Sequence, residues 1–95
     1  MMDIVKQNET FALQDTTEAF EMKGTATYEV AGGLTIHFNL VNPEGEYFGD
    51  CSYYKYADGD RTNFNLNVAE ARRVELSEYA DSVITSMLEY LKAAN

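Results

Sequence analysis

The chain has 95 residues, of which 45% are hydrophobic and 24% charged, so it can form one domain with one modest core. Its net charge is −9 and it has only seven Lys and Arg residues, which disfavours direct binding to nucleic acid or to an anionic membrane. No apolar run approaches the roughly 18 residues that a membrane-spanning helix needs. The single cysteine, Cys51, excludes an intrachain disulfide and a cysteine-based metal cluster.

The N-terminal part of the chain carries the weakest structural signals. Residues 9–14, with Phe11 and Leu13, predict a short strand, and residues 14–18 predict a turn. We treat residues 1–95 as a single domain in which residues 1–8 are candidates for a flexible segment. The start lacks the basic head and apolar stretch of a secretory signal, and the chain lacks paired cysteines, so we expect a cytoplasmic protein.

Polar and apolar residues then alternate through most of the chain up to residue 68. An alternation with a period of two indicates strands that have one dry and one wet face. The predicted strands are residues 19–30, 34–41, 46–56 and 61–68. The connections carry turn-forming residues, namely Gly32–Gly33, Asn42–Pro43–Glu44–Gly45 and Asp58–Gly59.

The C-terminal residues change to a helical period. Ser77 is a candidate N-cap, and residues 69–76 predict either an irregular link or a separate helical turn. The apolar stripe of the helix consists of Ala80, Val83, Ile84, Met87, Leu88 and Leu91. The predicted fold class is therefore α+β: a four-stranded antiparallel meander, with residues 9–14 as a candidate fifth strand, and one C-terminal helix packed on one face.

The lengths of the turns predict how the strands pair. The pairs that follow are Val30 with Leu34, Val41 with Glu46, and Tyr53 with Phe64. In this register Cys51 points inward and is expected to be a buried, unreactive side chain.

The same register places His37 opposite Asp50 on the wet face, within reach of a hydrogen bond. A histidine–carboxylate pair is the start of an acid/base site. Ser52 lies nearby, but no glycine-rich loop is present to supply an oxyanion hole. A small-ligand binder or enzyme using His37 and Asp50 is therefore an alternative, and a non-enzymatic protein is the main prediction.

Neither a metal site nor a cofactor is predicted. The chain has one histidine, and Asp58–Gly59–Asp60 lacks the ligand spacing of a calcium loop and is better explained as a hairpin turn.

The aromatic residues provide the functional hypothesis. Tyrosines with small polar neighbours are typical of protein-binding surfaces. The candidate binding residues on the wet face and its edges are His37, Asp50, Tyr54, Tyr56, Phe48, Asn63, Asn65, Asp58 and Asp60. Residues 1–60 carry eleven acidic and three basic side chains, a charge of −8, which favours a basic partner.

The main hypothesis is thus a small acidic protein-binding module, for example an inhibitor or decoy for a basic or nucleic-acid-binding protein. The second is a structural homo-oligomer such as a homodimer, in which sheet faces stack or the strand at residues 61–68 pairs with its copy.

Overall fold

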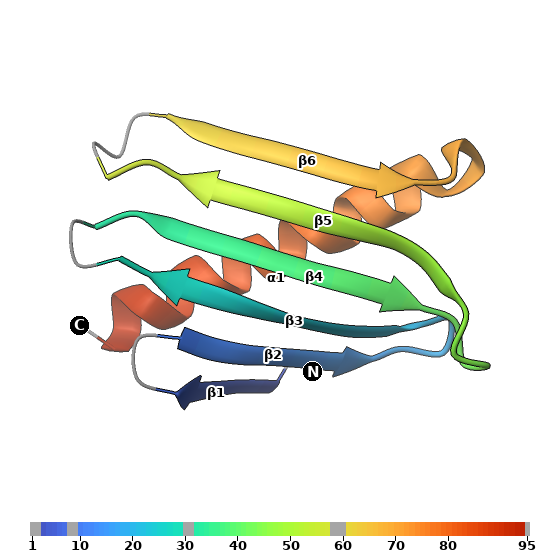
Figure 1. Ribbon diagram of the computed structural model, residues 1–95, viewed down its shortest axis with the longest axis horizontal. Coiled ribbons are helices and arrows are strands. Elements are labelled where there is room, and N and C mark those ends of the chain that lie inside the picture. Colours follow the sequence, from blue (N-terminus) through green and yellow to red (C-terminus); the bar gives the residue numbers. More distant parts are fainter. Residues whose placement is uncertain (1–2, 8–9, 30–31, 58–60, 95) are drawn as a thin grey trace.

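The computed structural model describes residues 3–7, 10–29, 32–57 and 61–94 (Figure 1). Six strands form one antiparallel sheet in which each strand lies beside the next in the chain. The strands are β1 (Asp3–Gln7), β2 (Thr10–Thr16), β3 (Glu21–Tyr28), β4 (Leu34–Val41), β5 (Tyr47–Lys55) and β6 (Thr62–Val68). A short 3₁₀ turn, η1 (Glu70–Arg72), leads into the helix α1 (Arg73–Ala94).

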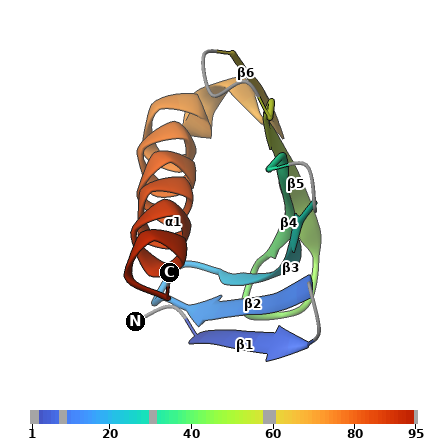
Figure 2. The ribbon, with the colours of Figure 1, turned by 90° about the vertical axis from the view of Figure 1, so that its left-hand side faces the viewer.

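The predicted fold class is confirmed: an antiparallel meander carries one C-terminal helix on one face. Strand β2 corresponds to the candidate fifth strand, whereas β1 is a further strand that was not predicted from the sequence. The sheet curves around α1, with β1 and β2 turned beneath the C-terminal end of the helix (Figure 2). We call the face covered by α1 the inner face and the opposite one, which faces the viewer in Figure 1, the outer face.

The core lies between the inner face and α1. Among the residues whose burial the structure describes, sixteen hydrophobic residues are buried there, and the largest of those that are fully enclosed is Phe38 on β4. Tyr79 of α1 packs edge-on against Phe20 and Phe38, with ring centroids 4.7 Å and 6.4 Å away. Its hydroxyl donates a hydrogen bond of 2.7 Å to Asp15, so the polar end of this half-buried ring is satisfied. Within the described residues, no helix is long and apolar enough to cross a membrane.

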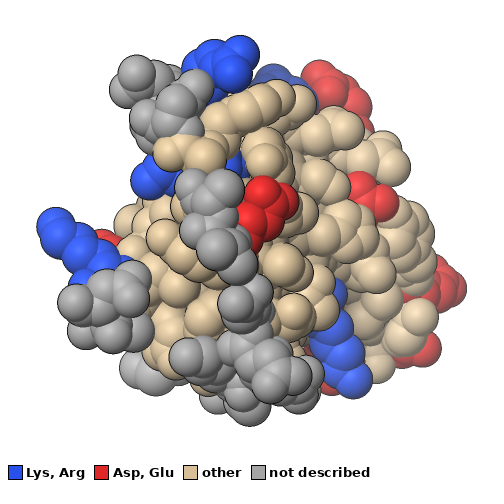
Figure 3. Space-filling model, turned by 60° about the vertical axis from the view of Figure 1, so that its left-hand side comes forward, with Lys and Arg blue, Asp and Glu red and all other residues tan. Residues whose placement is uncertain are grey.

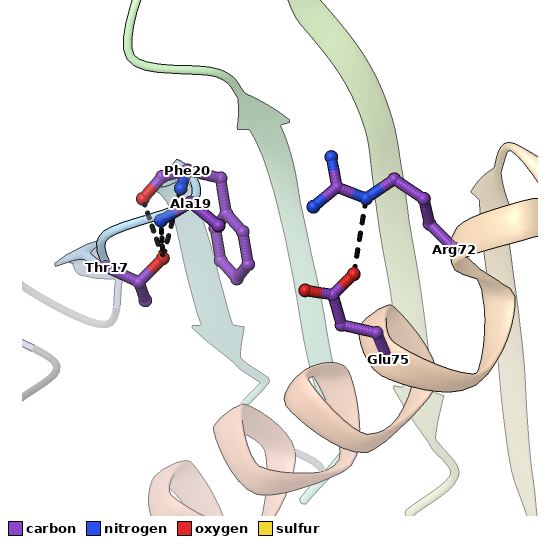
Figure 4. Close-up of polar contacts among 5 residues, drawn as sticks. All are labelled: Thr17, Ala19, Phe20, Arg72 and Glu75. Atoms are coloured by element: carbon purple, nitrogen blue, oxygen red, sulfur yellow. Dashed lines mark hydrogen bonds and ion pairs between the residues drawn. The ribbon is translucent and has the colours of Figure 1, made fainter.

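A tight turn at Thr17 joins β2 to β3. The Thr17 side-chain oxygen accepts hydrogen bonds from the backbone N–H groups of Ala19 and Phe20, at 3.2 Å and 3.1 Å (Figure 4). Its hydroxyl also lies 3.1 Å from the Phe20 carbonyl oxygen, to which it donates. The backbone groups in the turn cannot form the hydrogen bonds of the sheet, and the Thr17 side chain provides partners for some of them instead. The turn directs the Phe20 ring into the core.

The predicted register between β3 and β4 is wrong by two residues. Tyr28, not Val30, lies opposite Leu34. The hairpin closes earlier than predicted, because the Glu29 N–H donates to the Gly33 carbonyl at 2.8 Å and Gly32 adopts a positive φ of 105°. A shift of two residues keeps every side chain on its predicted face but changes its neighbour.

The register between β4 and β5 is also displaced by two residues. The turn is as predicted in its chemistry, since the Asn42 side-chain oxygen accepts from the Glu44 and Glu46 N–H groups and Gly45 has φ 89°. However, Glu46 pairs with Asn42 rather than Val41.

A β-bulge adds the second residue of this displacement. Val41 lies opposite Tyr47 but the preceding Leu40 lies opposite Gly49, so β5 contains one extra residue. The predicted pairing of β5 with β6 is confirmed, with Tyr53 opposite Phe64 and Gly49 opposite Val68.

The helix begins at Arg73, four residues before Ser77, so the prediction of Ser77 as the N-cap is wrong. The preceding η1 is the separate helical turn that was one of the two predictions for this segment. The earlier start extends the apolar stripe by one turn and buries Leu76 completely. Arg72 and Glu75 form an ion pair of 3.3 Å across the junction (Figure 4).

Candidate functional site

The outer face is a broad area of small polar side chains over β3 to β6. The register aligns these side chains in three cross-strand rows. The rows are Thr27–Thr35–Tyr54–Asn63, Thr25–His37–Ser52–Asn65 and Lys23–Asn39–Asp50–Asn67. The part of this face that Figure 3 shows, on the right of the view, is mostly uncharged.

The predicted pairing of His37 with Asp50 is wrong. Ser52 lies opposite His37, and Asn39 lies opposite Asp50, because of the displaced register between β4 and β5. Asp50 instead accepts a hydrogen bond from the Tyr47 hydroxyl, and this bond raises the pKa of Tyr47. The alternative of an acid/base site at His37 and Asp50 thus loses the direct opposition on which it depended.

An aromatic cluster lies at one end of the outer face. The rings of Tyr54 and Tyr56 meet edge to face with centroids 4.8 Å apart. The Arg61 guanidinium carbon lies 4.5 Å from the centre of the Tyr56 ring, a cation–π contact. Both tyrosines are half-buried, so the cluster offers fixed aromatic surface.

A hollow of about 200 Å³ adjoins this cluster. Its lining comprises Thr35, Ser52, Tyr53, Tyr54, Asn63 and Asn65. The structure thus brings together three of the predicted site residues, Tyr54, Asn63 and Asn65, around one depression.

Gly33 lies beside the hydroxyl end of Tyr54 and close to Glu29. A Cβ atom at Gly33 would lie 2.9 Å from Glu29 Oε2 and 3.1 Å from the Tyr54 hydroxyl oxygen. The carboxylate of Glu29 and the hydroxyl of Tyr54 therefore converge on the same small space above Gly33. Glu29 is not one of the predicted site residues, although the polar/apolar alternation places it on the polar face. Its proximity to Tyr54 follows from the observed register of the β3–β4 hairpin, which differs from the predicted one.

The remaining predicted residues are not part of this assembly. Asp58 and Asp60 lie outside the described residues. Phe48 is the extra residue at the bulge of β5, and its position on the outer face stays a prediction. His37 is exposed one row away from the tyrosines.

A second depression, of about 350 Å³, lies between the C-terminal half of α1 and the β3–β4 hairpin. Its walls are formed by Tyr28, Gly32, Leu34, Lys55, Leu88, Leu91 and Lys92. This depression could not be predicted from the sequence pattern, because its lining comes from three strands and the helix.

Cys51 is completely buried, as predicted. Burial, and secondarily the negative charge of Asp50, raise the pKa of the thiol to about 12. We expect the native thiol to react with a disulfide reagent at pH 8 at least about 100-fold more slowly than the thiol of the urea-unfolded chain, because it is both inaccessible and protonated. Absorbance of the released thiolate measures both rates, and equal rates would contradict the buried position.

Among the described residues, no group of three His, Cys, Asp or Glu side chains is arranged to hold a metal ion. No protein-family model, no curated protein and no solved structure matches the chain. A functional argument therefore depends on the geometry of the outer face, since a fold class by itself implies no function.

Proposed function

We propose that this protein is a non-enzymatic binding module whose outer face contacts a basic surface of another protein. The observation that supports this proposal best is the hollow beside Tyr54. Tyr54, Asn63 and Asn65 line it, and the Glu29 carboxylate lies close to the hydroxyl end of the Tyr54 ring. An aromatic anchor in a small depression resembles the centres of protein interfaces, where a few residues provide most of the binding energy.

The size of the hollow favours a protein partner over a free small molecule. Ligand pockets typically occupy about 300–1,000 Å³ and are enclosed, whereas this depression of about 200 Å³ lies on an open sheet face. It suits one inserted side chain. The surrounding flat rows of Thr, Ser and Asn allow a partner to approach closely.

The charges favour a lysine or arginine as the inserted side chain. Its hydrocarbon stem would lie against the Tyr54 ring, and its charged end would lie near Glu29 and the Tyr54 hydroxyl. The net charge of −9 would attract a basic partner over longer distances. A role as a cytoplasmic inhibitor or decoy, occupying a surface that otherwise binds nucleic acid, is consistent with this charge.

The first test is affinity capture from lysate of the source cells at low and high salt, with mass spectrometry of the retained proteins. We expect a basic protein that is lost at high salt, because screening weakens the attraction. Substituting Tyr54→Ala should weaken the purified complex by about 30-fold, as expected for an interface anchor. Glu29→Gln should reduce the salt dependence of binding.

The matched control is Tyr47→Ala, because Tyr47 is also on the outer face and is 56% exposed but does not line the hollow. Isothermal titration calorimetry should give nearly unchanged affinity for this variant. Equal losses in Tyr47→Ala and Tyr54→Ala, or full binding by Tyr54→Ala at low salt, would contradict the proposed site.

A further inference from the structure

In the described part of the chain, strand β6 forms one edge of the sheet and pairs only with β5. The Tyr56 N–H donates to the Arg61 carbonyl at 3.0 Å, so Arg61 belongs to a hydrogen-bonded pair. In an antiparallel ladder such pairs alternate, and the residues between them direct their backbone groups to the opposite side. The residues of β6 whose N–H and C=O groups point to the open edge are therefore Thr62, Phe64, Leu66 and Val68.

This edge lacks the features that usually prevent strands from pairing with other chains. The segment Thr62–Val68 contains no charged residue and no proline, and its pairing with β5 shows no bulge. The opposite edge, β1, contains both Asp3 and Lys6. Phe64 on β6 is 45% exposed although its side chain belongs to the inner face. Strand β6 thus presents both unfilled backbone groups and uncovered apolar surface.

The absence of charged residues on β6 indicates which partner pairs with this edge. A two-fold axis places the residues beside it close to their own copies, so a charged residue at the centre of the interface would be repelled by its copy. With a net charge of −9, two copies of this protein meet with least repulsion at an uncharged surface. We propose that two copies pair through β6 in antiparallel orientation and form one continuous sheet of twelve strands.

The register of this dimer follows from the backbone pattern. A two-fold axis at Asn65 places Phe64 opposite the partner's Leu66 and uses the whole length of the strand, about 23 Å at 3.3 Å per residue. Every edge-directed residue then meets an edge-directed residue, so both hydrogen bonds of each pair form. The exposed ring of Phe64 gains an apolar neighbour, and the two Asn65 amides lie opposite each other on the outer face.

Asn65→Lys tests the pairing. Two lysines would face each other across the axis, and we expect the dimer dissociation constant to rise about ten-fold or more in sedimentation equilibrium. The matched control is Asn39→Lys, which is also exposed on the outer face but lies on the interior strand β4. Both variants lower the net negative charge equally, so a general charge effect would strengthen association in both.

Amide hydrogen exchange of the wild-type protein gives an independent readout. The N–H groups of Phe64 and Leu66 should become protected as the protein concentration rises, whereas those of an isolated monomer edge stay unprotected. A monomer mass at every concentration, exchange at these amides that does not depend on concentration, or equal dissociation by Asn65→Lys and Asn39→Lys would each overturn the proposal.

Discussion

Phe38→Ala is expected to lower the free energy of unfolding by about 3–5 kcal/mol, the largest loss for any single truncation in the core. Phe38 is fully buried at the centre of β4 and packs edge-on against Tyr79 of α1. Its cross-strand neighbours on the inner face are Gly24 and Cys51, which are both small. Since neither neighbour can extend into the space left by the ring, the cavity would remain largely open.

Urea unfolding measures this loss. A domain of this size has a total stability of roughly 5–14 kcal/mol, so the variant would lose a large part of it. Phe64→Ala is the matched control, because Phe64 also belongs to the inner face but is 45% exposed; we expect a loss of about 1 kcal/mol or less in the monomer. Equal losses at the two positions would contradict the described core. Phe38→Leu provides a milder variant if Phe38→Ala fails to fold.

The faces of the strands could be predicted from the sequence, because burial imposes a period of two on the side chains. The alternation around Ile36 and Phe38 is strong enough to identify the inner face without any tertiary information. The pairing of β5 with β6 was also predictable, since the short connection containing Asp58–Gly59 restricts the register to one choice.

The neighbours across β3, β4 and β5 were not predictable. The bulge after Leu40 inserts one residue into β5, and the turn at Asn42 shifts the pairing by one more. Each shift alone would have turned the side chains of β5 to the wrong face, but the two together leave the hydrophobic pattern unchanged. Hydrophobic patterning therefore carries no information that distinguishes the predicted register from the observed one.

This ambiguity affected the candidate site more than the fold. A displacement of two residues removes the opposition of His37 and Asp50. The same kind of displacement, at the β3–β4 hairpin, brings Glu29 close to Tyr54. The residue types on the outer face could thus be predicted, whereas the contacts around the hollow depend on the conformations of two turns and one bulge.

Gly24→Ala should destabilise the protein by about 3 kcal/mol, an unusually large effect for the addition of one methyl group. A Cβ atom at Gly24 would lie 2.1 Å from the His37 carbonyl oxygen and 2.4 Å from Phe38 Cβ. The carbonyl belongs to the backbone of β4, so the clash can be relieved only by moving β3 away from β4. That movement would also disturb the outer-face rows that cross these strands at Thr25 and His37.

Gly45→Ala separates this clash from the general cost of replacing a glycine. Gly45 has a φ of 89°, yet a Cβ atom there would have no neighbour within 4 Å. The substitution should cost only about 1 kcal/mol, from backbone strain in the turn. Urea unfolding of both variants compares the two costs directly. If Gly24→Ala were as stable as Gly45→Ala, β3 and β4 would not approach each other at Gly24 as closely as described. The three cross-strand rows of the outer face would then also have to be revised.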